Sequence, residues 1–328
     1  MTIHHRIHPE AHSPLGYRHV DVFAGKAFTG NSLAVFPESP GLSSARMLAI
    51  TQELRHFETI FLSGAKVPGE AGGAGEPGGP GEPGEVHARV FDLFEELPFA
   101  GHPVLGAAAV LHERAEDHGH AGDHEHAGDV GVRHWRFRLP HKTVPVTTRR
   151  TTAGYHAALD QGKPEFLGSV PERDRPEIAA ALSLPEGTLA GLPLEVVSTG
   201  LRYLIVPVVG GLSGARIVRG DFAELIARHG AQFAYLVDVE ALEGRHWNND
   251  GVLEDVATGS AAGCAGAYLA RHRIVPAEKG FTLRQGRFTG RPSLLDVLPQ
   301  GRPEDLRNVR VGGEVTMVAR GILDTLPE

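Results

Sequence analysis

Apolar and polar residues alternate in short runs along much of the chain, and this period of two is typical of β-strands. Residues 17–36 form two such runs around a Gly-rich turn, and residues 56–62, HFETIFL, form another. Later ranges are also rich in strand-forming residues: 195–209, 233–240 and 308–323. Helical runs between them are few. The pattern predicts an α+β fold, not the regular strand-helix alternation of a doubly wound sheet.

One amphipathic helix is predicted within residues 43–54. Ser43 or Ser44 is the expected N-cap, because a hydroxyl oxygen satisfies a free amide of the first turn. Met47, Ile50 and Leu54 then recur on one face, which is the spacing of a helix that packs against other elements.

A second helix is predicted to start at Gly101-His102-Pro103. Pro103 suits the first turn, because its φ angle is fixed and it has no amide proton, which makes His102 the expected N-cap. Residues 104–111 are small or apolar on every side, the pattern of a buried helix. The free amides and positive dipole end of an internal helix start suit an anionic ligand such as a carboxylate. The alternative is a buried helix with an unusual cap, since His is a poor N-cap residue.

An internal similarity links this helix to a later part of the chain. Residues 95–111 match residues 253–269 at a shift of 158 positions. Both ranges contain acidic residues, then a Gly, then a predicted helix of small residues. The shift places Gly101 on Gly259 and His102 on Ser260. We expect two similar domains, each built around one buried helix, with both helix starts facing a cleft suited to a small anionic substrate.

The net charge of −8 comes mainly from two segments of low complexity. Residues 64–86 are rich in Gly, Pro and Glu and carry −3, and residues 113–134 are rich in His and acidic residues and carry −4. Both are predicted to be disordered surface insertions, and residues 1–16 a disordered tail. The rest of the chain is nearly neutral, which argues against a nucleic-acid-binding protein.

The second segment contains four histidines that could bind a transition metal through their ring nitrogens: His118, His120, His124 and His126. No anchoring structure is evident around them, so we favour a solvated loop and predict no metal site. Cys264 is the single cysteine, which excludes internal disulfides and any mechanism with two thiols. Its Ala- and Gly-rich surroundings favour a small buried packing residue over a nucleophile.

The length of 328 residues allows roughly two domains. No apolar run is long enough to span a bilayer, and the first residues lack the apolar centre of a signal peptide. We therefore expect a cytoplasmic protein that does not interact with membranes.

Glu58 is the first candidate for chemistry. Strand alternation puts it on the same side as Ile60 and Leu62, and an apolar setting raises the pKa of a carboxyl group toward the range useful for proton transfer. His102 and Asp255 are further candidates, each beside the start of a small-residue helix. Each of the three also has an ordinary explanation: an edge-strand glutamate, an N-cap and a turn residue.

Their combination is more specific. The motifs GNSLAVF, FETIFL, ELPFAGHPVLGAA, GVLEDVATGSAAG, GRPSLLDV and VGGEV occur in an order and spacing that closely resemble the PhzF family. This family is named for phenazine biosynthesis, and its fold is like that of diaminopimelate epimerase. The resemblance extends from Tyr17 to about Leu323.

The resemblance implies two domains, each a curved mixed or antiparallel sheet around a central helix, with the active site between them. The expected N-terminal domain covers residues 17–138 and is completed by about residues 319–328, and the C-terminal domain covers residues 139–318. The family commonly forms homodimers, and exposed strand edges favour such pairing.

The resemblance also implies roles for individual residues. Glu58 matches the catalytic glutamate, which moves a proton between substrate carbons without a metal or an organic cofactor. His102 and Asp255 match polar residues that position the substrate and assist proton movement. The helix-start residues match groups that hold its polar end: Gly101, Gly259 and Ser260.

The chain departs from the family pattern at two positions, with Phe57 where Ser is frequent and Val256 where Pro is common. Neither change removes a catalytic group, but Phe57 could alter the pocket. Related epimerases use two cysteines, and Ala100 and Asp255 stand near the corresponding places here, which excludes a two-thiol mechanism.

The leading hypothesis is a cofactor-independent isomerase of the trans-2,3-dihydro-3-hydroxyanthranilate isomerase type, in phenazine-like antibiotic or other secondary metabolism. Two alternatives stay open at this point. One is an amino-acid racemase or epimerase that uses Glu58 with Asp255 or His102. The other is a non-catalytic protein that binds a metabolite or a metal.

Overall fold

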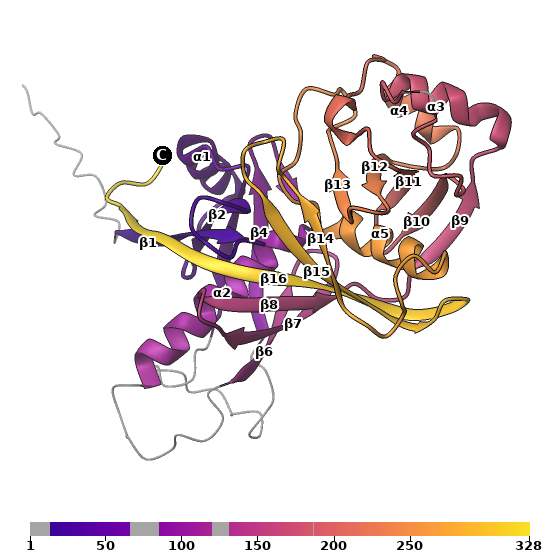
Figure 1. The fold of residues 1–328 in the computed structure, drawn as a ribbon. Helices are drawn as coiled ribbons and strands as arrows, with labels where there is room; N and C mark the ends of the chain where they lie inside the picture. The colour runs from indigo at the N-terminus through magenta and orange to yellow at the C-terminus, as the bar shows by residue number, and fades with distance from the viewer. Residues whose placement is uncertain (1–13, 66–84, 120–130, 186) are drawn as a thin grey trace, which may run out of the picture.

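The computed structural model describes residues 14–65, 85–119, 131–185 and 187–328 (Figure 1). Residues 1–13 of the predicted tail, residues 66–84 of the first predicted insertion and residues 120–130 of the second lie outside these ranges. Two long helices, α2 (Gly101–Gly119) and α5 (Gly259–Arg271), are each surrounded by strands of one continuous sheet. We call the two resulting parts the α2 unit and the α5 unit.

The strands of the α2 unit close into a barrel. Their order is β1-β2-β3-β4-β6-β7-β8-β16, β16 pairs back with β1, and the short β5 pairs with β4. Their bounds are β1 (Leu15–Val22), β2 (Asn31–Phe36), β3 (Glu58–Ser63), β4 (Glu85–Asp92), β5 (Glu96–Leu97), β6 (Val132–Arg138), β7 (Thr143–Arg150), β8 (Tyr155–Asp160) and β16 (Asp305–Leu323). Helix α1 (Ser44–Leu54) packs on the outside of this barrel against β3 and β4.

The α5 unit continues the sheet from the same β16, in the order β16-β15-β14-β13-β12-β11-β10-β9. The added strands are β9 (Glu165–Ser169), β10 (Glu195–Ser198), β11 (Arg202–Val208), β12 (Phe233–Asp238), β13 (Glu243–Arg245), β14 (Phe281–Gln285) and β15 (Ser293–Arg302). The inner face of this part of the sheet curves around α5. Helices α3 (Arg175–Ala181) and α4 (Phe222–Ala227) form an outer layer, and two short 3₁₀ turns, η1 (Glu172–Asp174) and η2 (Leu212–Gly214), lie in the connections.

Both central helices follow from their composition. Residues 104–111 of α2 are all buried, and the missing side chain of Gly106 leaves room for Leu33 and Val20. In α5, Gly259 and residues 261–270 are all buried. A helix that is apolar all round must be enclosed, and the curved sheet encloses it.

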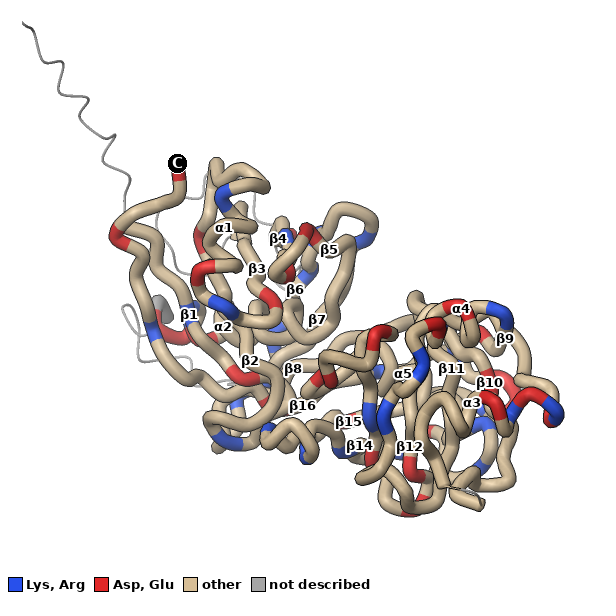
Figure 2. The backbone as a smooth tube through the Cα atoms, turned by 90° about the horizontal axis from the view of Figure 1, so that it is seen from above, with Lys and Arg blue, Asp and Glu red and all other residues tan. Residues whose placement is uncertain are grey.

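Strand β16 belongs to both units (Figure 1). Its first part pairs with β15, residues 310–315 pair with β8, and residues 315–323 pair with β1. Gly312 lies where a Cβ atom would stand 2.5 Å from the carbonyl oxygen of Ala157, so the crossing from one unit to the other requires a glycine. Acidic and basic residues of the described ranges are spread over both units (Figure 2).

The predicted α+β fold, with a sheet that curves around each central helix, is confirmed, although the strands around the two helices belong to one continuous sheet. The helix at Ser44–Leu54 is also confirmed, and Ser43 is its cap, since its hydroxyl oxygen accepts a hydrogen bond from the amide of Arg46. The similarity between the two halves is confirmed at its central point, because Gly101 and Gly259 are each the first residue of a central helix.

Three expectations need correction. Helix α2 begins at Gly101, so His102 lies inside its first turn and is not the N-cap. The same helix continues to Gly119, so the beginning of the predicted insertion 113–134 is ordered, and Glu113 is paired there with Arg18. Leu15 and Gly16, assigned to the tail, begin β1. The domain limits remain a prediction, although pairing and packing group β7 and β8 with the α2 unit.

Candidate active site

Glu58 is the first residue of β3, and its side chain points into the molecule. Ile60 and Leu62, which share its face of the strand, are fully buried in the core around α2. Only 8% of Glu58 is exposed. The strand alternation predicted from the sequence therefore places a carboxyl group at the inner edge of the α2 core.

His102 lies directly beside it. The ring atom Nδ1 of His102 is 3.4 Å from Oε2 of Glu58, and both side chains are buried. Within the described part of the chain, Oε2 of Glu58 and Nε2 of His102 have no hydrogen-bond partner. Buried polar atoms normally have partners, so these two atoms are available to a bound molecule.

Burial favours the neutral forms of both groups. Burial raises the pKa of Glu58 well above its ordinary value, and the charges of Asp255 and then Asp92 raise it further. Burial lowers the pKa of the His102 imidazole, and the nearby Asp255 opposes this only in part. A protonated carboxyl group next to a neutral imidazole can give a proton to a ligand, and after ionisation it is a strong base.

Asp255 approaches from the α5 unit and is held by three donors. Its Oδ1 accepts from Nδ2 of Asn31 at 3.3 Å and from the amide of Ala257 at 3.3 Å, and its Oδ2 accepts from the hydroxyl of Thr258 at 2.7 Å. Asn31 is the first residue of β2 in the α2 unit, and its Nδ2 also lies 3.2 Å from the carbonyl oxygen of Ala257. The two units therefore meet through a side-chain amide and a carboxylate at the candidate site.

The backbone of Asp255 is fixed by Gln285 on β14. The side-chain nitrogen of Gln285 donates to the carbonyl oxygen of Asp255 at 3.0 Å and to the hydroxyl of Thr258 at 2.9 Å. Its side-chain oxygen accepts from the amide of Thr258 at 3.1 Å and from the hydroxyl of Tyr235 at 3.0 Å. Because every polar atom of this buried amide is used, the segment before α5 has little freedom to move.

Gly259 and Ser260 form the start of α5. The hydroxyl of Ser260 lies 2.8 Å from that of Tyr203, a buried residue on β11 whose pKa is raised by burial. A Cβ atom on Gly259 would stand 3.3 Å from the ring of Phe23, so the close approach of the two units at this point favours glycine. Gly101 has open space where a Cβ atom would lie.

The structure thus gathers Glu58, His102 and Asp255 closely enough for their charges to influence one another. Four residues around them were not predicted: Asn31, Tyr203, Thr258 and Gln285. Asn31 stands in the motif GNSLAVF, which was a usable signal. The other three come from strand or capping positions that look ordinary in the sequence, and only tertiary packing brings them together.

Cys264 is buried within α5, and burial raises the pKa of its thiol to about 11, which fits the predicted packing role. No group of three or more potential metal ligands occurs in the described ranges. Three of the four histidines considered as metal ligands lie outside those ranges: His120, His124 and His126. The side chain of His118 also lies outside the described part of the chain. In the same ranges, no helix is long and apolar enough to cross a membrane.

Comparison with known proteins gives a consistent result. A family model described as "Phenazine biosynthesis-like protein" matches residues 20–321. The chain belongs to the PhzF family. A trans-2,3-dihydro-3-hydroxyanthranilate isomerase of Pseudomonas aeruginosa is 31% identical over 314 residues, which cover 92% of this chain and 96% of that protein.

Solved structures also share the fold. A protein of Pseudomonas aeruginosa described as a predicted epimerase is 43% identical and has a TM-score of 0.77, with 95% of this chain and 99% of that chain covered. A PhzF-family protein of Bacillus anthracis has a TM-score of 0.74 at 20% identity, with the same coverage, and supports the fold alone. Family membership and the names of the relatives identify the chain as an isomerase.

Proposed function

We propose that this PhzF-family isomerase moves a proton between two carbons of a small unsaturated carboxylate, with Glu58 as the group that carries the proton. The observation that carries the proposal is the buried, unpartnered Oε2 of Glu58, 3.4 Å from a neutral His102. A carboxyl group whose pKa is raised can hold a proton between two transfer steps.

In the proposed reaction, the ionised carboxylate of Glu58 removes a proton from one carbon. The electrons of the broken C–H bond move into the adjacent double bonds, and the carboxyl group returns the same proton to a second carbon. Atoms and electrons balance within the substrate, so the step needs no oxidant or reductant. A single carboxyl group reaches both carbons only if the substrate is compact and conjugated.

The helix starts supply the proposed binding groups. The first turns of α2 and α5 contain free amides and the positive ends of two helix dipoles, which favour a carboxylate. Ser260 adds a hydroxyl group next to the α5 amides. The unpartnered Nε2 of His102 supplies a further donor or acceptor. These groups suit a substrate with an anionic end and a polar substituent.

The relative named trans-2,3-dihydro-3-hydroxyanthranilate isomerase acts on a molecule of this class, and we propose a substrate of the same type. We also propose that the reaction belongs to secondary metabolism and needs no cofactor.

Epimerisation is the second candidate, because the solved protein with 43% identity is described as a predicted epimerase. An epimerase with two bases needs groups on opposite faces of one carbon. His102 lies on the same side as Glu58, so Asp255 from the other unit is the better second base. Asp255 is already held by three donors, which favours a positioning role and ranks epimerisation second.

The test is incubation with trans-2,3-dihydro-3-hydroxyanthranilate in deuterated water. The absorbance and the mass of the compound are monitored over time, and Glu58→Gln is the control variant. A new absorbance band that depends on Glu58 supports the isomerase. If that compound is unchanged, a panel of amino acids and hydroxy acids is tested for exchange at a chiral carbon. Exchange with inversion would favour the epimerase and reject the double-bond shift.

A further inference from the structure

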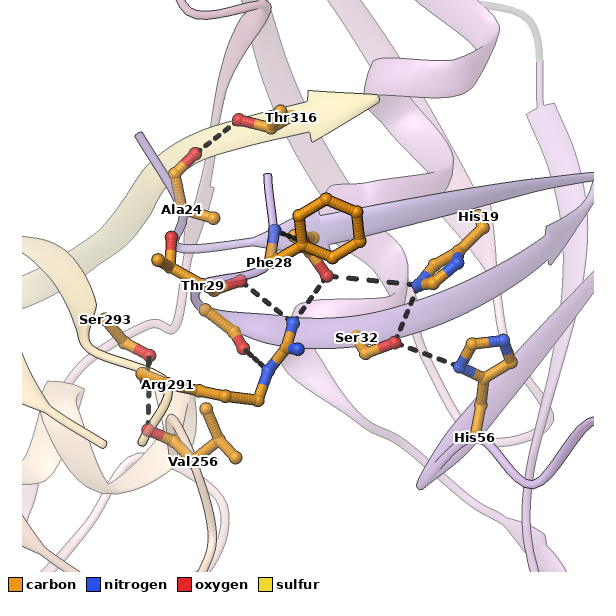
Figure 3. Close-up of polar contacts among 12 residues, drawn as sticks. His19, Ala24, Phe28, Thr29, Ser32, His56, Val256, Arg291, Ser293 and Thr316 are labelled. Atoms are coloured by element: carbon orange, nitrogen blue, oxygen red, sulfur yellow. Dashed lines mark hydrogen bonds and ion pairs between the residues drawn. The ribbon is translucent and has the colours of Figure 1, made fainter. Parts of the chain in front are cut away.

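Arg291 connects the two units near the candidate site without belonging to it. It lies in the loop between β14 and β15 of the α5 unit, and its guanidinium reaches the β1–β2 turn of the α2 unit (Figure 3). Its Nε donates to the carbonyl oxygen of Gly30 at 2.8 Å. Another nitrogen donates to Oδ1 of Asp21 at 2.7 Å and to the carbonyl oxygen of Thr29 at 3.0 Å.

Asp21 needs this partner, because only 1% of it is exposed. Its second oxygen accepts from the amide of Phe28 at 2.6 Å, within the same turn. Removing one partner of a buried ion pair leaves an uncompensated charge, so the pair with Arg291 fixes where the turn can lie. We call Arg291, Asp21 and residues 23–30 the clamp.

Backbone hydrogen bonds reinforce the clamp from both sides. The amide of Gly30 donates to the carbonyl oxygen of Pro292 at 3.2 Å, and the amide of Leu294 donates to that of Phe23 at 3.0 Å. Gly30 has a φ of 64°, and a Cβ atom there would overlap the carbonyl oxygen of Val22. The turn is therefore tightly defined, and the next residue after it is Asn31.

The Arg291 loop also holds the other side of the Asn31–Asp255 contact. The hydroxyl of Ser293 donates to the carbonyl oxygen of Val256 at 3.3 Å (Figure 3). A Cβ atom on Gly286, at the start of the loop, would stand 2.6 Å from the same oxygen. One loop thus contacts the turn that presents Asn31 and the segment that presents Asp255.

A chain of polar contacts extends from the clamp toward Glu58. Nε2 of His19 lies 4.0 Å from Oδ1 of Asp21 and 2.8 Å from the hydroxyl of Ser32, which lies 3.0 Å from Nδ1 of His56 (Figure 3). Ser32 follows Asn31 and His56 stands two residues before Glu58. The contacts join β1, β2 and the entry to β3.

We propose that Arg291 is a positioning residue that sets the α2 unit against the α5 unit, so that Asn31 stays on Asp255 and Glu58 faces the same substrate. This proposal rests on the proposed function of Glu58 and Asp255. Arg291 acts through its contacts with Asp21 and with the turn of residues 23–30, and it touches no reacting atom. An error of about 1 Å in such an arrangement lowers turnover by up to roughly 10²-fold.

The test is a double-mutant cycle with Arg291→Gln, Asn31→Ala and the double variant, in the full-length protein. We expect each single variant to lower kcat/KM roughly 10-fold or more. The double variant should be little worse than either single variant, because both act through one contact. Arg291→Lys keeps the charge but not the two-sided guanidinium, so its kcat/KM should lie between those of wild type and Arg291→Gln.

Arg219→Gln is the matched control. Arg219 also pairs through its guanidinium with Asp221, but it lies beside α3 and α4 on the outer layer of the α5 unit. This variant should retain the wild-type kcat/KM. A wild-type kcat/KM for Arg291→Gln would overturn the proposal. A double variant whose loss of kcat/KM equals the product of the losses in Arg291→Gln and Asn31→Ala would also overturn it.

Hydrogen–deuterium exchange separates failure of the clamp from failure of the proposed function. Residues 21–31 and 255–260 should both exchange faster in Arg291→Gln than in wild type, whatever substrate the protein uses. Unchanged exchange in residues 255–260 would reject the clamp even in an active isomerase. If Arg291→Gln does not fold, Asp21→Asn, which keeps an acceptor for Phe28, replaces it in the same measurement with the same expected result.

Discussion

Glu58 and Asp92 stand opposite one another in the antiparallel pair of β3 and β4. Asp92 directs Oδ1 to the amides of Phe94 and Glu95, each at 2.7 Å, and its charge still raises the pKa of Glu58. Asp255 contributes more strongly from the other unit, and burial contributes most. The proton affinity of the candidate catalytic carboxyl group is therefore determined by burial and by two carboxylates that are distant from it in the sequence.

These contributions predict the effect of neutralising each partner. Asp255→Asn should lower the pKa of Glu58, and Asp92→Asn should lower it less, while burial keeps it above the ordinary value in both variants. The measurement is a pH titration of ¹³C-labelled glutamate carboxyl groups by NMR, with Glu58→Gln to assign the signal. Asp305→Asn, at an exposed ion pair with Lys163, is the control. An unchanged Glu58 titration in Asp255→Asn would contradict the electrostatic account.

The raised pKa of Glu58 also predicts a stability effect. Above the ordinary pKa the unfolded chain loses this proton while the folded protein keeps it, so folding stability falls as pH rises toward the raised pKa. The loss is about 1.4 kcal/mol per pH unit in that interval. The Glu58→Gln variant has no carboxyl group at this position and does not lose this stability. Its melting temperature should therefore exceed that of wild type by a margin that widens from pH 5 toward neutral pH. A margin that is constant or shrinks with rising pH would show that Glu58 ionises normally.

His102→Ala and Asp255→Asn should weaken binding and turnover together. Their proposed roles are to hold the substrate and to orient it toward Glu58, so the interactions that they supply are present in the bound state and become stronger in the transition state. Steady-state kinetics on a compound that the wild-type protein converts should give a higher KM and a lower kcat for both variants. A fall in kcat with no change in KM for Asp255→Asn would instead favour a second catalytic base.

Packing around α5 predicts the effect of Gly266→Ala. A Cβ atom at this position would overlap Cγ1 of Val297 on β15, a stiff β-branched side chain in the core. Overpacking costs about 1–3 kcal/mol, which exceeds the gain of about 0.5–1 kcal/mol from replacing glycine in a helix. Chemical denaturation should show lower stability for Gly266→Ala than for Gly101→Ala, where open space is available. Equal stability in the two variants would contradict the tight contact between α5 and β15.

Local patterns predicted much of this molecule. The match of residues 95–111 with residues 253–269 located both central helices, since a helix of small residues has a recognisable composition wherever it is enclosed, although the predicted cap at His102 was wrong. The alternation around Glu58 placed its carboxyl group in the core, because the period of a strand depends on its own residues. Family membership, predicted from linked motifs, is confirmed by the family model.

The rest depends on contacts that local patterns do not contain. Residues 113–119 looked like part of a disordered segment, yet they continue α2 because Arg18 on β1 pairs with Glu113 and Tyr155 on β8 donates to Glu116. Gln285 and Tyr203 joined the site from strands without a motif of their own. Arg291 stood in the motif GRPSLLDV, but only the fold shows that it reaches Asp21 in the other unit.

The proposed role of Glu58 as the proton carrier is tested most directly by the turnover number of Glu58→Gln at saturating substrate. Gln keeps the shape of the side chain and most hydrogen bonding, so the variant should fold and bind the carboxylate ligand. Turnover should fall by roughly 10²-fold or more, because positioned proton transfer typically contributes about 10² to 10⁴. Turnover of Glu58→Gln close to that of wild type would mean that another group carries the proton.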